Sequence, residues 1–150
     1  MTTLRAHGLD LTVQRGWEAR IWMPDEPAPA ENHPVVRIAN FALTTSHDTY
    51  TTEAVEDLRP GQVVASLVEF SPRLAGRGLY APAGVPRLRV ADLEPRALQG
   101  ARPGRFGLQR FFSQSGRAFS LYVMAREGPG LAEALRQLET QLREMGMAAR

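Results

Sequence analysis

The sequence contains neither cysteine nor lysine, and each absence removes a class of chemistry. Without thiolates there is no disulfide framework, no cysteine-ligated zinc or iron–sulfur centre, and no cysteine nucleophile. Without lysine there is no Schiff-base catalyst and no standard P-loop. All 18 basic side chains are therefore arginines, against 16 acidic ones. The resulting net charge of +2 is too small to indicate a class of partner.

Long hydrophobic runs are also missing. The longest strongly apolar stretch, residues 63–68, is far shorter than the roughly 20 residues of a membrane helix. The first residues, Met1 to Arg5, are not followed by the apolar core of a signal peptide. We therefore expect a cytoplasmic protein with no membrane partner. The 150 residues fit a single domain, 1–150, which can bury a core without cross-links.

The N-terminal half contains three segments with strand patterns. Residues 9–13 and 17–23 alternate apolar and polar positions on either side of Arg15-Gly16, which predicts a hairpin. Residues 35–43 are apolar at nearly every position and predict a further strand. A polar stretch then leads into a predicted short helix, residues 53–58, which Pro60-Gly61 ends.

The C-terminal half is more regular. Residues 62–70 are apolar on both faces, which predicts a central strand covered on both sides. Residues 106–114 and 117–125 flank Ser115-Gly116 and predict a second hairpin. The last apolar series steps by four and three residues, as one face of an α-helix does; its members are Leu131, Leu135, Leu138, Leu142 and Met145.

Residues 71–105 are rich in proline and glycine and predict an irregular segment. Within it, residues 85–90 fit an edge strand, where Pro86 would be tolerated. The whole pattern predicts the α+β class: a largely antiparallel, twisted sheet of about 6–7 strands, with the C-terminal amphipathic helix and a short helix packed on it.

The order of these elements resembles that of a known fold family. An N-terminal strand, the turn Gly16-Trp17, a strand, a helix before Pro60-Gly61, a late hairpin and a final helix are similar to the PsbP-like α/β/α sandwich proteins. That resemblance implies a sandwich fold and a role in binding other proteins. It transfers no catalytic or binding residue to this chain.

Residues that often carry chemistry lack the spacing that a site needs. His7, His33 and His47 are far apart in the sequence, so we expect neither a metal site nor a cofactor. Ser46-His47-Asp48 contains the residue types of a hydrolytic triad, but consecutive residues cannot converge as a triad does. We therefore assign no catalytic residue and interpret this stretch as a turn and capping segment.

A glycine pattern at residues 76–81 matches Gly-x-Gly-x-x-Ala. A dinucleotide site needs that pattern directly between a strand and a helix. Pro72 separates it from the preceding strand and Pro82 blocks a helix after it. The sequence therefore predicts a loop here.

The charges are unevenly distributed. Residues 73–117 contain nine arginines and two acidic residues, whereas residues 16–72 contain three arginines and nine acidic residues. Guanidinium groups bind carboxylates and phosphates in a bidentate manner, so the first segment could hold an anion. Alternatively, the two segments neutralise each other across the fold. The speculative binding residues from this segment are Arg73, Arg77, Arg87 and Arg89.

Two aromatic positions are candidates for an interface. Trp22 points opposite Trp17 and Ile21, on the more polar face of the predicted hairpin. An exposed tryptophan there would be an interface residue, and the alternative is burial under a helix. Phe111-Phe112 places one ring on each face of its strand, which favours a sheet covered on both sides.

Taken together, these patterns favour a non-enzymatic protein-binding or assembly module, with another protein or a second copy as its partner. The alternative is a protein or enzyme that binds a small anionic ligand through arginines of residues 73–117, with His47 as acid or base. Nucleic acid ranks third, because the net charge is small and the phenylalanines have the spacing of core residues.

Overall fold

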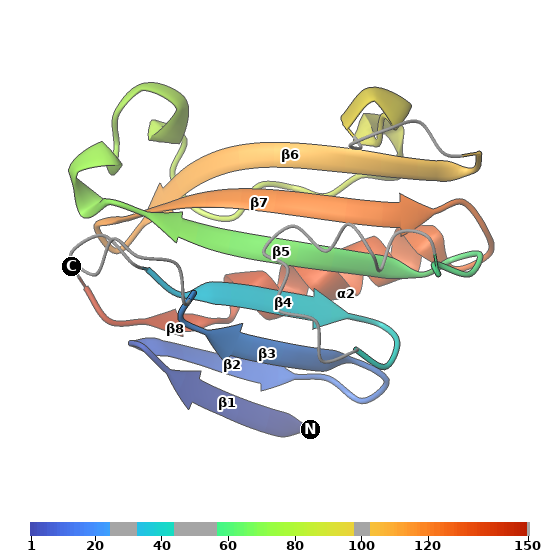
Figure 1. The fold of residues 1–150 in the computed structure, drawn as a ribbon, viewed down its shortest axis with the longest axis horizontal. Helices are drawn as coiled ribbons and strands as arrows, with labels where there is room; N and C mark the ends of the chain where they lie inside the picture. The colour runs from blue at the N-terminus through green and yellow to red at the C-terminus, as the bar shows by residue number, and fades with distance from the viewer. Residues whose placement is uncertain (25–32, 44–56, 98–102, 150) are drawn as a thin grey trace.

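The computed structural model describes residues 1–24, 33–43, 57–97 and 103–149, with the side chain of Arg96 left out. The described strands form two antiparallel sheets, one of three strands in the order β1-β2-β8 and one of five in the order β3-β4-β5-β7-β6 (Figure 1). The α+β class is confirmed, although the strands are divided between two sheets. The strands are β1 (Thr2–Ala6), β2 (Leu9–Val13), β3 (Glu18–Trp22), β4 (Val35–Ala39), β5 (Val63–Phe70), β6 (Arg105–Gln114), β7 (Arg117–Arg126) and β8 (Gly146–Met147).

The first predicted hairpin is wrong. Strand β2 pairs with β1 around His7-Gly8, where both residues have positive φ, and β3 pairs with β4. The turn at Arg15-Gly16 instead carries the chain from one sheet to the other. Directly after this turn, Trp17 is buried and its Nε1 donates to Gln137 Oε1 at 2.9 Å. Strand β1 was missed because most of its side chains are polar or exposed.

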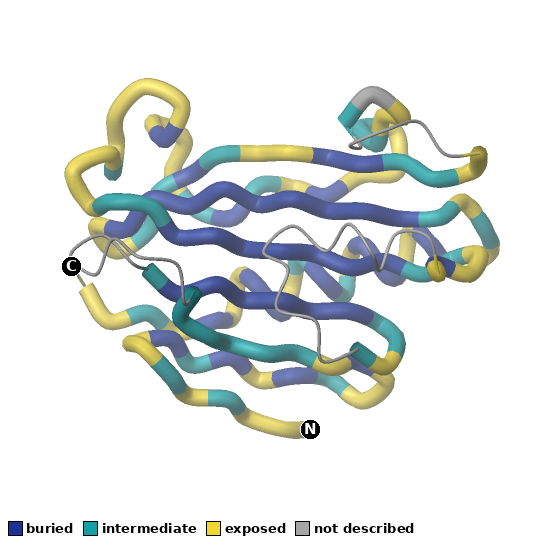
Figure 2. The backbone as a smooth tube through the Cα atoms, viewed as in Figure 1, coloured by how far each residue is buried: buried dark blue, intermediate teal, exposed yellow. Residues whose placement is uncertain are grey.

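The second hairpin and the central strand are confirmed. Strands β6 and β7 pair in full register around Ser115-Gly116. Both of these turn residues have positive φ, as the type I′ turn requires. Strand β5 lies between β4 and β7 and is buried on both faces. Figure 2 shows the buried positions concentrated in β4, β5 and β7.

The larger core lies between the five-stranded sheet and helix α2 (Leu131–Arg143), which lies behind the sheet in Figure 1. The predicted helix is confirmed, but it ends two residues early; Met145 is nevertheless buried in the same core. Phe112 and Phe119 stack in this core with 5.3 Å between ring centroids. Strand β2 adds Leu11, so the small sheet closes one side of the core. In the part of the chain that the structure describes, no helix is long and apolar enough to cross a membrane.

The opposite face of the five-stranded sheet carries a smaller apolar cluster. Its buried members include Leu58, Val64 and Met124. The predicted helix at residues 53–58 falls mostly outside the described residues, and Leu58 itself is buried without being helical. Phe111 lies half-buried on this face while Phe112 enters the larger core, as the sequence predicts.

Residues 85–90 do not form the predicted edge strand. Val85 and Leu88 are buried in the larger core instead of lying along a sheet edge. The helix holds their backbone, since Leu88 N donates to Glu139 Oε1 at 2.7 Å and Arg143 Nη2 donates to Val85 O at 3.1 Å. Side-chain acceptors and donors from α2 thus replace the hydrogen bonds of a strand partner. The surrounding segment contains four 3₁₀ turns, η1 (Pro72–Leu74), η2 (Gly78–Tyr80), η3 (Val90–Asp92) and η4 (Pro95–Ala97).

Candidate functional site: a groove between the two sheets

The two sheets meet at a pair of strand edges that have no strand between them. Strand β1 is the terminal strand of the small sheet and β3 is the terminal strand of the large one. Each is hydrogen-bonded to a strand on one side only, β1 to β2 and β3 to β4. Strands β1 and β3 contact each other. Each therefore has one edge whose backbone N–H and C=O groups pair with none of the strands that the structure describes.

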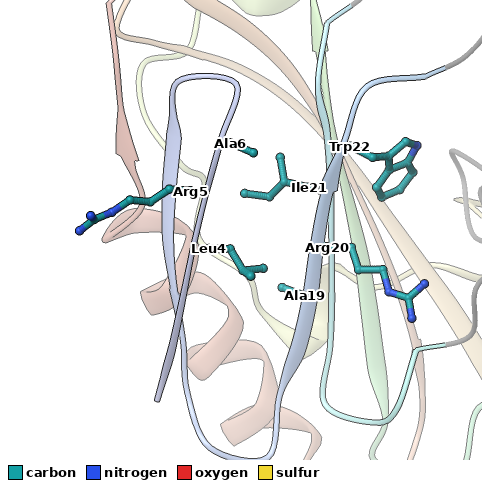
Figure 3. Close-up of a pocket in the computed structure, with 7 residues that line it drawn as sticks. All are labelled: Leu4, Arg5, Ala6, Ala19, Arg20, Ile21 and Trp22. Carbon is teal, nitrogen blue, oxygen red and sulfur yellow. The ribbon is translucent and has the colours of Figure 1, made fainter.

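Figure 3 shows that the space between these strands is lined by apolar side chains. Leu4 and Ala6 of β1 point toward β3, and Ala19 and Ile21 of β3 point toward β1. This arrangement follows from the alternation of side chains along a strand, which places every second residue on the same face. The small alanines leave room that larger side chains would fill.

The groove has measurable volume. One hollow of about 340 Å³ is lined by the β1 residues from Leu4 to Ala6 and the β3 residues from Ala19 to Trp22. A neighbouring hollow of about 250 Å³ shares Leu4 and Ala19 and continues toward Trp17. The two hollows adjoin along β1 and β3, and we call them together the β1–β3 groove.

The charged residues at the rim are already engaged and point away from the groove (Figure 3). Arg5 Nε donates to Asp10 Oδ2 at 2.8 Å. Arg20 Nη2 donates to Leu43 O at 3.2 Å, and Glu18 Oε2 accepts from Leu43 N at 2.5 Å. The converging surface is therefore apolar side chains and strand edges.

Trp22 lies on the outer side of the groove wall. Its ring faces away from Leu4 and Ala6 in Figure 3, on the sheet face opposite the larger core. The guanidinium carbon of Arg37 lies 5.0 Å from the ring centroid, a cation–π contact. Arg37 is only 4% exposed. No sequence pattern predicts burial of this arginine, because a charged residue in an apolar run is usually expected at the surface.

Among the described residues, the arginines of residues 73–117 lie on several different elements. Arg73 and Arg77 lie on or beside η1 and η2, Arg87 and Arg89 lie in the stretch before η3, and Arg110 lies on β6. All five are exposed. Arg102 and the side chain of Arg96 fall outside the described residues, as does His47.

Arg117, in contrast to these five exposed arginines, is buried and only 2% exposed. Its Nη1 lies 2.7 Å from Glu69 Oε1, and its Nε donates to Ala148 O at 2.9 Å. Its Nη1 and Nη2 also donate to His7 O at 3.5 and 3.4 Å. His33 Nδ1 approaches the other Glu69 oxygen at 3.7 Å. Arg117 thus joins the two sheets and is not available to an external anion.

The described residues contain few other groups of side chains that could bind a metal ion or take part in catalysis. Among the described residues there is no group of three or more His, Cys, Asp or Glu side chains that could hold a metal ion. Residues 76–81 form part of a loop with η2, as the sequence predicts, and do not open an α-helix. The sequence did not predict the β1–β3 groove, because it depends on how two separate sheets meet.

Comparison with protein-family models, with curated proteins and with solved structures finds no match for this chain.

Proposed function

We propose that this chain is a non-enzymatic module that binds another polypeptide, and that the β1–β3 groove is its contact surface. The observation that carries the proposal is that the terminal strands of two sheets meet without pairing and enclose an apolar hollow between them. Natural proteins usually cover or charge such edges, because exposed edges recruit other chains. An extended segment would find both backbone partners and sites for apolar side chains here.

Two further observations support a binding role over catalysis. The groove residues whose side chains converge are Leu4, Ala6, Ala19 and Ile21, none of which can transfer a proton. The buried pair Glu69–Arg117 is enclosed in the fold and engages backbone carbonyls. The similarity in element order to the PsbP-like proteins also favours binding, by analogy of fold alone.

The test is capture of a partner from an extract of the cells that produce this protein. Ala19→Arg places a long charged side chain in the groove, and Ala132→Arg, on an exposed position of α2, is the matched control. We expect the wild type and the control to retain the same partner at one-to-one stoichiometry, and the groove variant to lose it. Retention of that partner by Ala19→Arg, with folding intact by circular dichroism, would contradict the proposal.

Self-association is one outcome of the same experiment. If the retained partner is a second copy of the chain, sedimentation of the purified protein will show a dimer that Ala19→Arg converts to a monomer. Either partner supports a binding module. A protein that stays monomeric and retains no partner from the extract would contradict it.

A further inference from the structure

A second surface lies at the opposite border of the five-stranded sheet. Residues Ser71–Gly84, which we call the η1–η2 lobe, project beyond the end of β6 at the upper left of Figure 1. Successive backbone hydrogen bonds fix its course. Leu74 N donates to Ser71 O at 3.0 Å, Arg77 N to Leu74 O at 3.1 Å, and Tyr80 N to Arg77 O at 2.9 Å. These hydrogen bonds give the lobe a defined backbone conformation.

Strand β6 anchors this lobe. The Ser113 hydroxyl donates to Tyr80 O at 2.6 Å and accepts from Gly76 N at 2.9 Å. The Tyr80 ring is 9% exposed and packs 6.0 Å from the Phe70 ring and 5.5 Å from the Phe111 ring, centroid to centroid. Because contacts with β6 already fix the conformation of the lobe, binding of a partner would cost little conformational entropy there.

The lobe carries both exposed cations and exposed apolar side chains. Arg73 and Arg77 are exposed and make no ion pair with any residue that the structure describes. Leu74 is 41% exposed and Leu79 is 66% exposed. Four large apolar side chains are exposed in the described ranges, and these leucines are two of them. Arginines beside apolar contacts are typical of the energetic centres of protein interfaces.

The local charge is of one sign. Residues 71–91 contain four arginines and no acidic residue. Beside the lobe lies a hollow of about 510 Å³, lined mainly by small residues such as Gly76, Gly84 and Gly116, together with Ser113. A polypeptide backbone can approach closely where side chains are this small.

We propose that the η1–η2 lobe docks an acidic polypeptide segment, whose carboxylates pair with Arg73 and Arg77 and whose apolar residue packs on Leu79. Bidentate pairing of guanidinium with carboxylate supplies the specificity. A nucleic acid fits this surface less well, because the aromatic ring of the lobe, Tyr80, is buried and cannot stack on bases. This surface is distinct from the β1–β3 groove and goes beyond the function proposed there.

The test uses a displayed library of random peptides selected against the wild-type protein. The best enriched peptide is then synthesised with a fluorophore, and its binding is measured by anisotropy at low salt. Four variants are compared with the wild type: Arg73→Glu with Arg77→Glu, Leu79→Ser, Ala19→Arg, and Arg15→Glu with Arg59→Glu. The last is the matched control, since it makes the same charge change at exposed arginines outside the lobe.

We expect enriched peptides to be rich in Asp and Glu around an apolar residue. The lobe double variant should weaken binding at least about tenfold, and Leu79→Ser by about threefold to tenfold. The charge control should stay within about twofold, because distant exposed charges are screened. Ala19→Arg should leave this binding unchanged, which separates the lobe from the groove.

Three results would overturn the proposal. One is the absence of acidic enrichment in the selected peptides. Another is an equal loss of binding in the lobe variant and the charge control, which would indicate nonspecific attraction. The third is oligo-dT that binds more tightly than the peptide and loses binding in the same lobe variant, which would indicate a nucleic-acid surface.

Discussion

The two borders of the five-stranded sheet are treated in opposite ways. At the β6 border the chain covers its own edge: Gly107 N donates to Glu94 O at 2.9 Å, and Ser113 N donates to Pro82 O at 2.8 Å. At the β3 border the neighbouring strand is β1, which makes no ladder with it. One edge is thus blocked by the protein's own backbone at both ends, and the other opens onto an apolar groove.

This difference determines where an added strand could pair with the sheet. A covered edge has few free backbone groups, so recognition at the β6 border falls to side chains such as Arg73 and Arg77. An open edge offers backbone groups along its length, so recognition at the β3 border needs only small and apolar side chains. The two proposed surfaces therefore differ in chemistry because the edges beneath them differ.

The largest expected effect concerns the link between the two sheets. Arg117→Ala leaves the Glu69 carboxylate buried and removes the donors to His7 O and Ala148 O. Loss of one partner of a buried pair costs about 3–5 kcal/mol. We expect the free energy of unfolding, measured in urea, to fall by that amount. Arg110→Ala, an exposed position on the neighbouring strand, should change it by less than about 0.5 kcal/mol; equal values for the two variants would show that the pair does not hold the sheets together.

A smaller effect is expected where Ser113 anchors the η1–η2 lobe. Ser113→Ala removes the donor to Tyr80 O and the acceptor for Gly76 N, and should cost about 1–2 kcal/mol. Hydrogen exchange should become faster at Gly76, while amides of α2 keep their protection. Thr12→Ala, on an exposed position of β2, serves as the control. Unchanged exchange at Gly76 would contradict the anchoring role.

The smallest expected effect is a difference in amide hydrogen exchange between the β6 edge and the β3 edge of the unmodified protein. The amides of Gly107 and Ser113 donate to the protein's own backbone. Alternate amides of β3 point away from β4, its one strand partner among the described residues. We expect exchange at Gly107 and Ser113 to be at least about tenfold slower than at those β3 amides. Equal protection at the two borders would show that the β3 edge is covered in solution.

The sequence predicts the elements that local pattern determines. The steps of four and three from Leu131 to Met145 define the buried face of α2, and Ser115-Gly116 defines the tight turn between β6 and β7. The two apolar faces of residues 63–70 define a central strand. In each case the signal lies within one short window, and packing agrees with it.

The remaining features depend on contacts between distant residues. The sequence pattern pairs residues 9–13 with residues 17–23, which is wrong. Their partner is β1, whose pattern is weak because only Leu4 and Ala6 are half-buried. Val85 and Leu88 have a strand-like composition, but α2 binds their backbone. The groove exists only because β1 and β3 end two different sheets, and no local pattern specifies that arrangement.

The most direct test of the binding module is site-specific cross-linking from the groove. Because the chain has no cysteine, Ala19→Cys introduces a unique thiol that can carry a photoreactive group, and Ala132→Cys provides the control on α2. Irradiation in an extract of the producing cells should link one protein, or a second copy of the chain, to position 19 and not to position 132. Equal labelling from both positions, or none from position 19, would contradict the central claim that the β1–β3 groove is the contact surface.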